Sequence, residues 1–121
     1  MVEEVRGSTN DGREEADALF GEAVDISPDD SQTVADYGRF KLVCCKDYST
    51  AEKLLRKSIK MDDGCIVGNY NLGILLLNDS EGKGSDIEGA LTSFATVVKV
   101  EPTHVEACRY WPGYTAGKTM L

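Results

Sequence analysis

The sequence is poor in the residues on which most metal and redox sites depend. Its 121 residues contain one His and four Cys, and no two Cys form a C-x-x-C pair. Zinc sites need several such ligands at short spacing, so we expect no metal site and no cofactor. Reduced thiols in a cytosolic protein are the simpler interpretation of Cys44, Cys45, Cys65 and Cys108.

Basic residues are also scarce. Lys and Arg number 13 against 21 Asp and Glu, which leaves a net charge of −8. Nucleic-acid phosphates and anionic membrane surfaces attract clustered Lys and Arg, so we expect the chain to bind neither. An acidic surface favours solubility and a basic protein partner instead.

Long apolar runs are missing as well. No stretch is long enough to span a bilayer, and the acidic segment 1–6 lacks the apolar core of a signal peptide. We therefore expect a protein of the cytoplasm, or of the nucleus. The apolar share of 41% is usual for a globular chain, and 121 residues suffice for one domain with a modest core.

One spacing of small and large residues occurs three times in the chain. The three copies are Ala16, Phe20, Ala23 and Pro28; Ala51, Leu55, Ser58 and Asp63; and Ala90, Phe94, Val97 and Pro102. Steps of 4 and 3 residues place the first three members of each copy on one face of a helix. The final Pro or Asp then falls in the turn that ends the helix.

A second spacing begins six residues after each of those turns. The three copies read Val34-x2-Tyr37-Gly38-x2-Lys41, Asn69-x2-Leu72-Gly73-x2-Leu76 and Cys108-x2-Trp111-Pro112. A glycine in mid-helix costs about 1 kcal/mol relative to alanine, yet Gly38 and Gly73 hold the same place in two copies. We therefore expect a neighbouring helix to approach both glycines too closely for a side chain.

The two spacings together resemble the tetratricopeptide repeat family, whose pattern is W-x2-L-G-x2-Y, then A-x3-F, then P. The periods here are 35 and 39 residues, and an insertion at residues 81–85 accounts for the longer one. That lengthening is similar to Sel1-like repeats, whereas Pro28 and Pro102 favour the tetratricopeptide form. The resemblance covers about residues 14–111 and implies an all-α fold, an α-α superhelix of about six antiparallel helices.

Apolar periodicity and turn residues together predict where the helices lie. The expected helices span residues 13–26, 31–45, 65–78, 86–100 and 103–111, and another follows an N-cap at Ser49 or Thr50 and runs to 61. The helix expected at 65–78 is apolar nearly all round, so we expect it to lie at the centre of the fold. Residues 1–12 are expected to be a disordered tail, residues 13–111 the helical repeat domain and residues 112–121 a C-terminal tail.

Two features have the appearance of catalytic motifs. Residues 112–119 nearly match a phosphate-binding G-x-x-x-x-G-K-[ST] loop, but Pro112 replaces the first Gly and no apolar strand precedes it. His104 lies at a predicted helix start without a Ser or Cys partner, and we expect it to be a surface residue. We therefore expect no enzyme.

The resemblance implies a concave groove lined by the first helix of each helix pair, which suits an extended or helical peptide. The matched spacing places there Gln32, Ala35, Asp36, Arg39, Leu42, Val67, Tyr70, Asn71, Ile74, Leu77, Glu106, Arg109 and Tyr110. We expect peptide contacts from Arg39, Tyr70, Asn71, Ile74 and Arg109. The alternative is that Ile74 belongs to the core and both arginines are solvated.

One subclass of the family holds the acidic tails of heat-shock chaperones with Lys and Asn, then Asn, then Lys and Arg. Asn71 matches the middle Asn, but Ala35 and Arg39 stand at the first pair of positions and Glu106 and Tyr110 at the last. A Glu there repels a carboxylate, so we expect no binding of chaperone tails.

The function that these features predict is a non-catalytic interaction module or scaffold for another protein or peptide. Two other functions stay open. One is a structural subunit of a larger assembly, which self-associates through its terminal helices. The other is a regulatory repeat domain of a larger enzyme.

Overall fold

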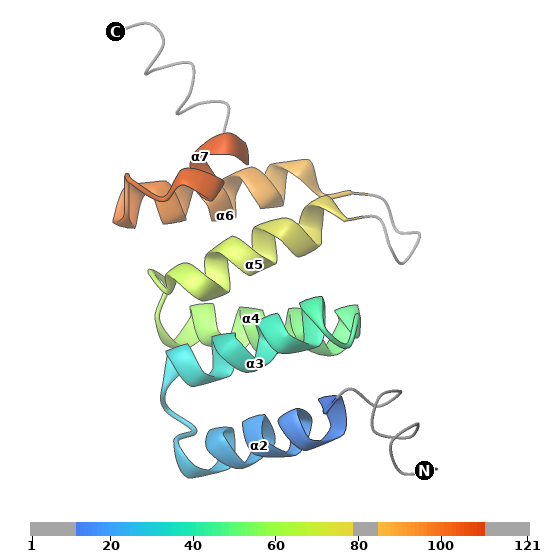
Figure 1. The fold of residues 1–121 in the computed structure, drawn as a ribbon. Helices are drawn as coiled ribbons and strands as arrows, with labels where there is room; N and C mark the ends of the chain where they lie inside the picture. The colour runs from blue at the N-terminus through green and yellow to red at the C-terminus, as the bar shows by residue number, and fades with distance from the viewer. Residues whose placement is uncertain (1–11, 79–84, 111–121) are drawn as a thin grey trace, which may run out of the picture.

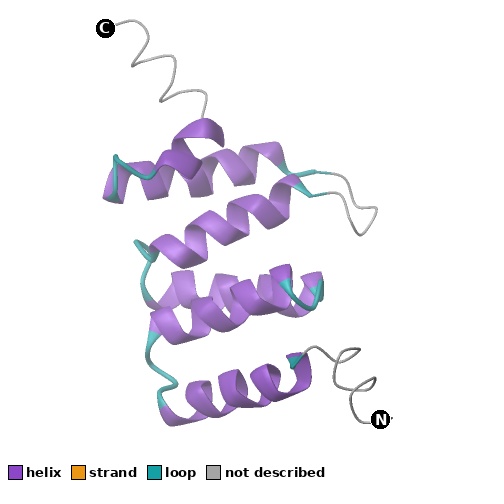
Figure 2. Cartoon of the chain, viewed as in Figure 1, coloured by secondary structure: helices purple, strands orange, loops and turns teal. Residues whose placement is uncertain are grey.

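The computed structural model describes residues 12–78 and 85–110, and all regular structure within them is helical (Figures 1 and 2). The helices are α2 (Arg13–Ile26), α3 (Ser31–Val43), α4 (Tyr48–Met61), α5 (Ile66–Leu77), α6 (Ile87–Val100) and α7 (Val105–Tyr110). The predicted all-α class is confirmed, and every predicted helix end lies within three residues of the observed one. Of the tail expected over residues 1–12 only Gly12 is described, and the tail expected at 112–121 and the loop-like motif at 112–119 lie outside the described residues.

The helices stack in chain order, and successive helices run in alternating directions (Figure 1). Helix α3 packs on α2, α4 and α5, while α5 also packs on α4 and α6, and α6 on α7. The apolar helix α5 therefore lies at the centre, as its sequence predicts. None of the described helices is long and apolar enough to cross a membrane.

The two mid-helix glycines lie where neighbouring helices come closest. A Cβ added to Gly38 would lie 2.9 Å from the Leu55 side chain, and one added to Gly73 would lie 2.7 Å from the Phe94 ring. Leu55 and Phe94 occupy the same place in the first repeated spacing. The same glycine contact thus recurs in the pairs α3–α4 and α5–α6, and the expected close approach is confirmed.

Two clusters of apolar side chains form the core. The first cluster consists of Leu42, Ala51, Leu55, Leu72 and Leu75, and the second of Ala90, Phe94, Val97, Val98 and Ala107. Ile74 and Leu76 of α5 pack against both clusters. Because α5 carries apolar side chains on opposite faces, it joins the two clusters into one continuous core.

Three of the described helices have an aspartate as their N-cap residue. The carboxylates of Asp30, Asp47 and Asp86 accept hydrogen bonds from backbone N–H groups in the first turns of α3, α4 and α6. A side-chain oxygen there replaces a missing helical acceptor and stabilises each helix by about 1 kcal/mol. These caps hold the loops of the stack in place, and the loop before α7 carries part of the site described next.

Candidate functional site

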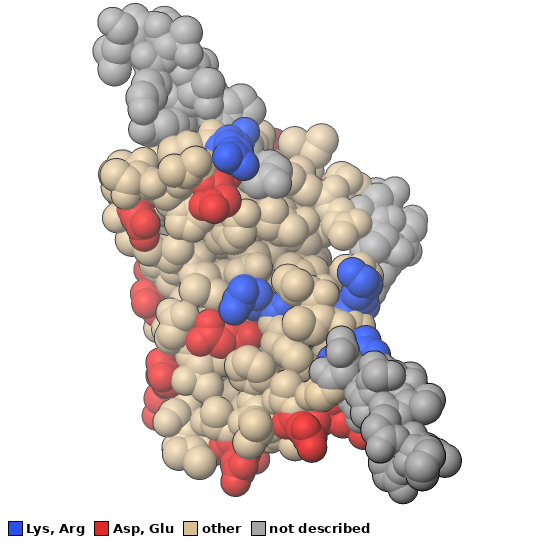
Figure 3. Space-filling model, viewed as in Figure 1, with Lys and Arg blue, Asp and Glu red and all other residues tan. Residues whose placement is uncertain are grey.

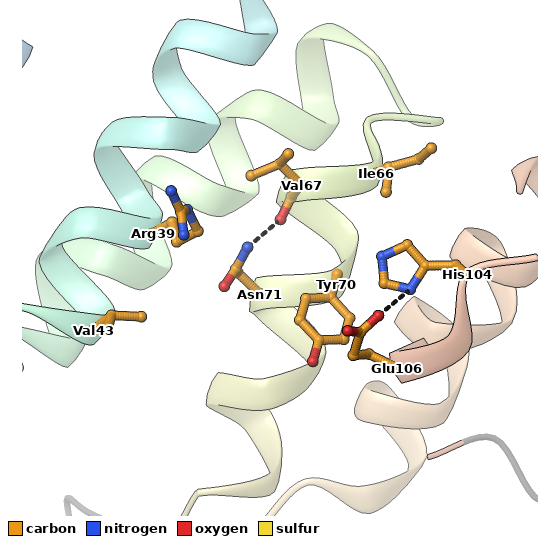
Figure 4. A pocket seen from close by; sticks show the side chains of 8 residues that line it. All are labelled: Arg39, Val43, Ile66, Val67, Tyr70, Asn71, His104 and Glu106. Carbon is orange, nitrogen blue, oxygen red and sulfur yellow. Dashed lines mark hydrogen bonds and ion pairs between the residues drawn. The ribbon is translucent and has the colours of Figure 1, made fainter. Parts of the chain in front are cut away.

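A pocket of about 460 Å³ opens between α3, α5 and the start of α7 (Figure 4). Its lining residues are Arg39, Val43, Ile66, Val67, Tyr70, Asn71, His104 and Glu106. The α3 and α5 residues lie one helical turn apart along their helices, because steps of 3 and 4 residues repeat one face. The pocket therefore follows from the placement of α3 on one side of Tyr70 and of His104 and Glu106 on the other (Figure 4).

Tyr70 forms one wall of the pocket and joins it to the core. Its ring lies 5.9 Å from the buried Phe94 ring and 5.0 Å from the His104 ring, measured between centroids. Both pairs are tilted, an arrangement that aromatic rings favour over a face-to-face sandwich. Since Phe94 is fully buried against Gly73, the wall has a rigid support.

Asn71 contributes a buried amide to the middle of the pocket. Its Nδ2 donates to the Val67 carbonyl oxygen at 2.8 Å, and the residue is only 6% exposed. Its Oδ1 accepts no hydrogen bond from any residue in the described part of the chain. Every buried side-chain oxygen in that part has a hydrogen-bond partner, so Oδ1 is not among the buried atoms. Oδ1 is therefore open to solvent and can accept a hydrogen bond from a ligand.

His104 differs from the sequence-based expectation of a surface residue. Its side chain is 18% exposed, and its Nδ1 accepts the Ala107 backbone N–H at 3.1 Å, which caps the start of α7. An accepting Nδ1 carries no proton, so the neutral ring has its N–H at Nε2, where it is a donor. The sequence pattern did not reveal this contact because His104 meets the Tyr70 ring only in the folded chain.

The charged residues lie at the two ends of the pocket. Arg39 is exposed on α3 and forms no ion pair with any residue that the structure describes, while Glu106 lies on α7. Helix α5 between them carries no charged residue. In the space-filling view the surface over α5 is accordingly tan, with blue and red atoms above and below it (Figure 3).

The structure brings together three of the five predicted contact residues. Arg39, Tyr70 and Asn71 all line the pocket. Ile74 instead packs against both core clusters, and Arg109 is exposed but is not part of the pocket lining. The difference arises because the pocket ends one turn before Ile74 on α5.

Two other residues that the spacing placed in the groove are buried. Ala35 is 0% exposed, Leu42 packs in the first core cluster, and neither lines the pocket. Both lie on the side of α3 that packs in the helix stack, where α4 and α5 contact it. This part of the groove prediction is wrong.

The repeated spacing did not predict three residues of the pocket, and the sequence indicates the position of only one of them. Val43 stands one helical turn after Arg39 and shares its face of α3. Ile66 and His104 lie at helix starts, where the periodicity of a single helix says little about orientation. Their place in the pocket depends on how the α4–α5 and α6–α7 turns fold back.

No three His, Cys, Asp or Glu side chains within residues 12–78 and 85–110 cluster closely enough to hold a metal ion. The chain matches no protein-family model, and no curated protein is significantly similar to it.

Proposed function

We propose that this protein is a non-catalytic interaction module of the tetratricopeptide repeat type, which acts in the cytoplasm or nucleus and binds a peptide segment of a partner. The single observation that supports this function best is the pocket itself. It joins apolar surface of α3 and α5 to polar groups of α5, α7 and the loop before α7 on one face of the helix stack. Sites of this composition suit peptides.

The polar groups of the pocket match a peptide backbone. The Asn71 Oδ1 accepts a backbone N–H, and the His104 Nε2 donates to a backbone carbonyl oxygen. The apolar groups take a side chain of the peptide. Val43 is 56% exposed, so covering it removes apolar surface from water and favours binding.

A pair of valine variants tests this function. Val43 lines the pocket, whereas Val100 is similarly exposed, at 50%, and lines a separate pocket of equal volume with Asp63 and Lys99. Partners captured from an extract of the native cells give binding segments that can be synthesised and titrated by calorimetry. Val43→Ala should weaken binding by about fivefold, which corresponds to roughly 1 kcal/mol of lost apolar burial.

Val100→Ala is the matched control and should leave the dissociation constant unchanged. Equal affinities of all three proteins for every captured segment would contradict binding in this pocket. Thermal unfolding of the two variants should agree, since both side chains are exposed to a similar extent.

The outer face of α2 favours a second function, a structural subunit that self-associates. Leu19 is 65% exposed and Ile26 is 74% exposed, and their spacing of seven residues puts them on one face of the helix. Light scattering over a range of concentrations tests this function. A dimer that survives high salt and is lost in Leu19→Glu supports assembly, whereas a monomer at all concentrations contradicts it.

A further inference from the structure

We propose that the pocket selects peptides by the order of their charges. An acidic side chain lies against Arg39, an apolar side chain covers Val43 and Tyr70, and a basic side chain lies against Glu106. This selectivity depends on the peptide binding proposed above and adds to it the chemical class of the ligand.

Arg39 supplies the positive end. It is exposed at the pocket rim, and none of the described carboxylates lies within ion-pair distance of its guanidinium. Asp36 stands one turn earlier on α3, and its Oδ1 accepts a hydrogen bond from Gln32 Nε2 at 3.1 Å. The guanidinium therefore keeps all five donors for a ligand, and its planar geometry suits a carboxylate.

Glu106 supplies the negative end. Its Oε1 lies 3.8 Å from His104 Nδ1, the nitrogen that accepts the Ala107 N–H at 3.1 Å (Figure 4). Arg109 stands three residues later on α7, and no ion pair forms between the two side chains. The Glu106 side chain is 59% exposed, so its carboxylate can meet a cation of the ligand.

The uncharged helix α5 separates the two ends (Figure 4). A peptide with acidic residues throughout would bring a carboxylate to Glu106, and a wholly basic one would bring a cation to Arg39. Each would lose one favourable contact and gain one repulsion. Exposed ion pairs are weak, so the charges decide which peptide binds and in which direction more than how tightly it binds.

The experiment starts from a phage library of random dodecapeptides selected on the intact protein. Selected peptides should carry an Asp or Glu and a Lys or Arg on opposite sides of an apolar residue. Titrated as synthetic peptides, they should bind Arg39→Glu and Glu106→Lys about fivefold more weakly than the unmodified protein, because each variant turns an attraction into a repulsion. Raising the salt concentration should shrink both differences.

Charge-matched controls and a rescue make the result specific. Lys53→Glu on α4 and Glu22→Lys on α2 change exposed residues outside the pocket by the same charge, and they should bind like the unmodified protein. Replacing the acidic residue of the peptide with Lys should restore binding to Arg39→Glu.

The outcomes separate the two proposals. Peptides that need Val43 but are indifferent to both charge reversals would overturn the charge order and leave peptide binding intact. Peptides that bind Val43→Ala as tightly as the unmodified protein, or a library that yields none, would overturn both.

Discussion

The two ends of the helix stack carry the same sequence pattern in different surroundings. In α6 the repeated residues Ala90, Phe94 and Val97 are at most 1% exposed. In α2 the equivalent positions are only half-buried, and the helix has no fully buried residue. A shared pattern therefore specifies which face of a helix packs, while the neighbouring helices decide how deeply that face is buried.

The junction of α2 and α3 is held by aromatic and polar contacts instead of a close apolar fit. The Phe20 ring stacks on Tyr37 at 5.6 Å and meets Phe40 at 5.0 Å. The Tyr37 hydroxyl donates to Asp17 Oδ1 at 2.6 Å, and Lys41 Nζ lies 3.1 Å from the same oxygen. Such polar groups can be partly exposed at little cost, because water supplies the hydrogen-bond partners that the protein does not.

The polar contacts shift two pKa values in opposite directions. The hydrogen bond from Tyr37, followed by that from Lys41, lowers the pKa of Asp17 below its usual value. Burial, followed by the hydrogen bond to Asp17, raises the pKa of Tyr37 to about 12. The junction of α2 and α3 is therefore sensitive to pH.

The largest expected difference between the two ends is the cost of losing an aromatic ring. Phe94→Ala should lower the free energy of unfolding by about 3–5 kcal/mol because it leaves a cavity under Gly73. Phe20→Ala, at a half-buried position, should cost about 1–2 kcal/mol. Urea unfolding followed by circular dichroism measures both, and Phe94→Leu provides a folded comparison if the alanine variant does not fold. Equal costs would contradict the contrast in burial.

Glycine substitutions should have opposite effects on stability in α2 and in the α5–α6 pair. Gly73→Ala forces a Cβ to 2.7 Å from Phe94, and overpacking of about 1–3 kcal/mol outweighs the gain of about 1 kcal/mol in helix propensity. Gly21→Ala on α2 meets only the Tyr37 Oη, at 3.9 Å, so it should stabilise the protein by about 0.5–1 kcal/mol. Melting temperatures of the two variants should shift in opposite directions. A stabilised Gly73→Ala would show that the helix pair can move apart without loss.

The smallest expected effect is the pH dependence of the α2–α3 junction. Since the folded pKa of Tyr37 lies near 12 and its ordinary value is 10.0, its contribution is complete below pH 10 and is lost between pH 10 and 12. The loss should be on the order of 1 kcal/mol, because the pair is partly exposed and solvent screens it. Tyr37→Phe should lack this alkaline loss, and Tyr48→Phe, the matched control, should keep it.

At low pH the stability of the junction depends on Asp17, whose contribution is lost as the pH falls. The folded pKa of Asp17 is lowered from 3.8, so its contribution is present above pH 3.8 and falls away as the pH drops through the lower folded value. Asp17→Asn should flatten this part of the unfolding curve. An unchanged acid profile in that variant would place the acid-sensitive contacts elsewhere in the chain.

Most of the fold was predictable from local patterns. Apolar spacing and turn residues identify all six described helices, and the paired glycines indicate where helices meet. The helix caps were harder to place: the prediction of Ser49 or Thr50 as the cap of α4 is wrong, because Asp47 accepts the Thr50 N–H there. Several residues in one turn can cap a helix, and the path of the preceding loop selects among them.

The candidate site was predictable only in part. A repeated spacing places Arg39, Tyr70 and Asn71 on the same faces of successive helices, and these residues do meet in one pocket. The same spacing cannot show that Ala35 is covered or that His104 turns inward to Tyr70. Both depend on the distance between helices, which side-chain size at the contact sets.

Short-range chemistry in the chain was enough to specify helices, their apolar faces and their pairing, because each of these depends on residues within a few turns of one another. The depth of the core, the half-exposed state of α2 and the pocket beside α5 arose from the packing of whole helices. The reason is geometric. Whether a side chain is buried or lines a cavity depends on the atoms packed around it, and many of these belong to residues far away in the sequence.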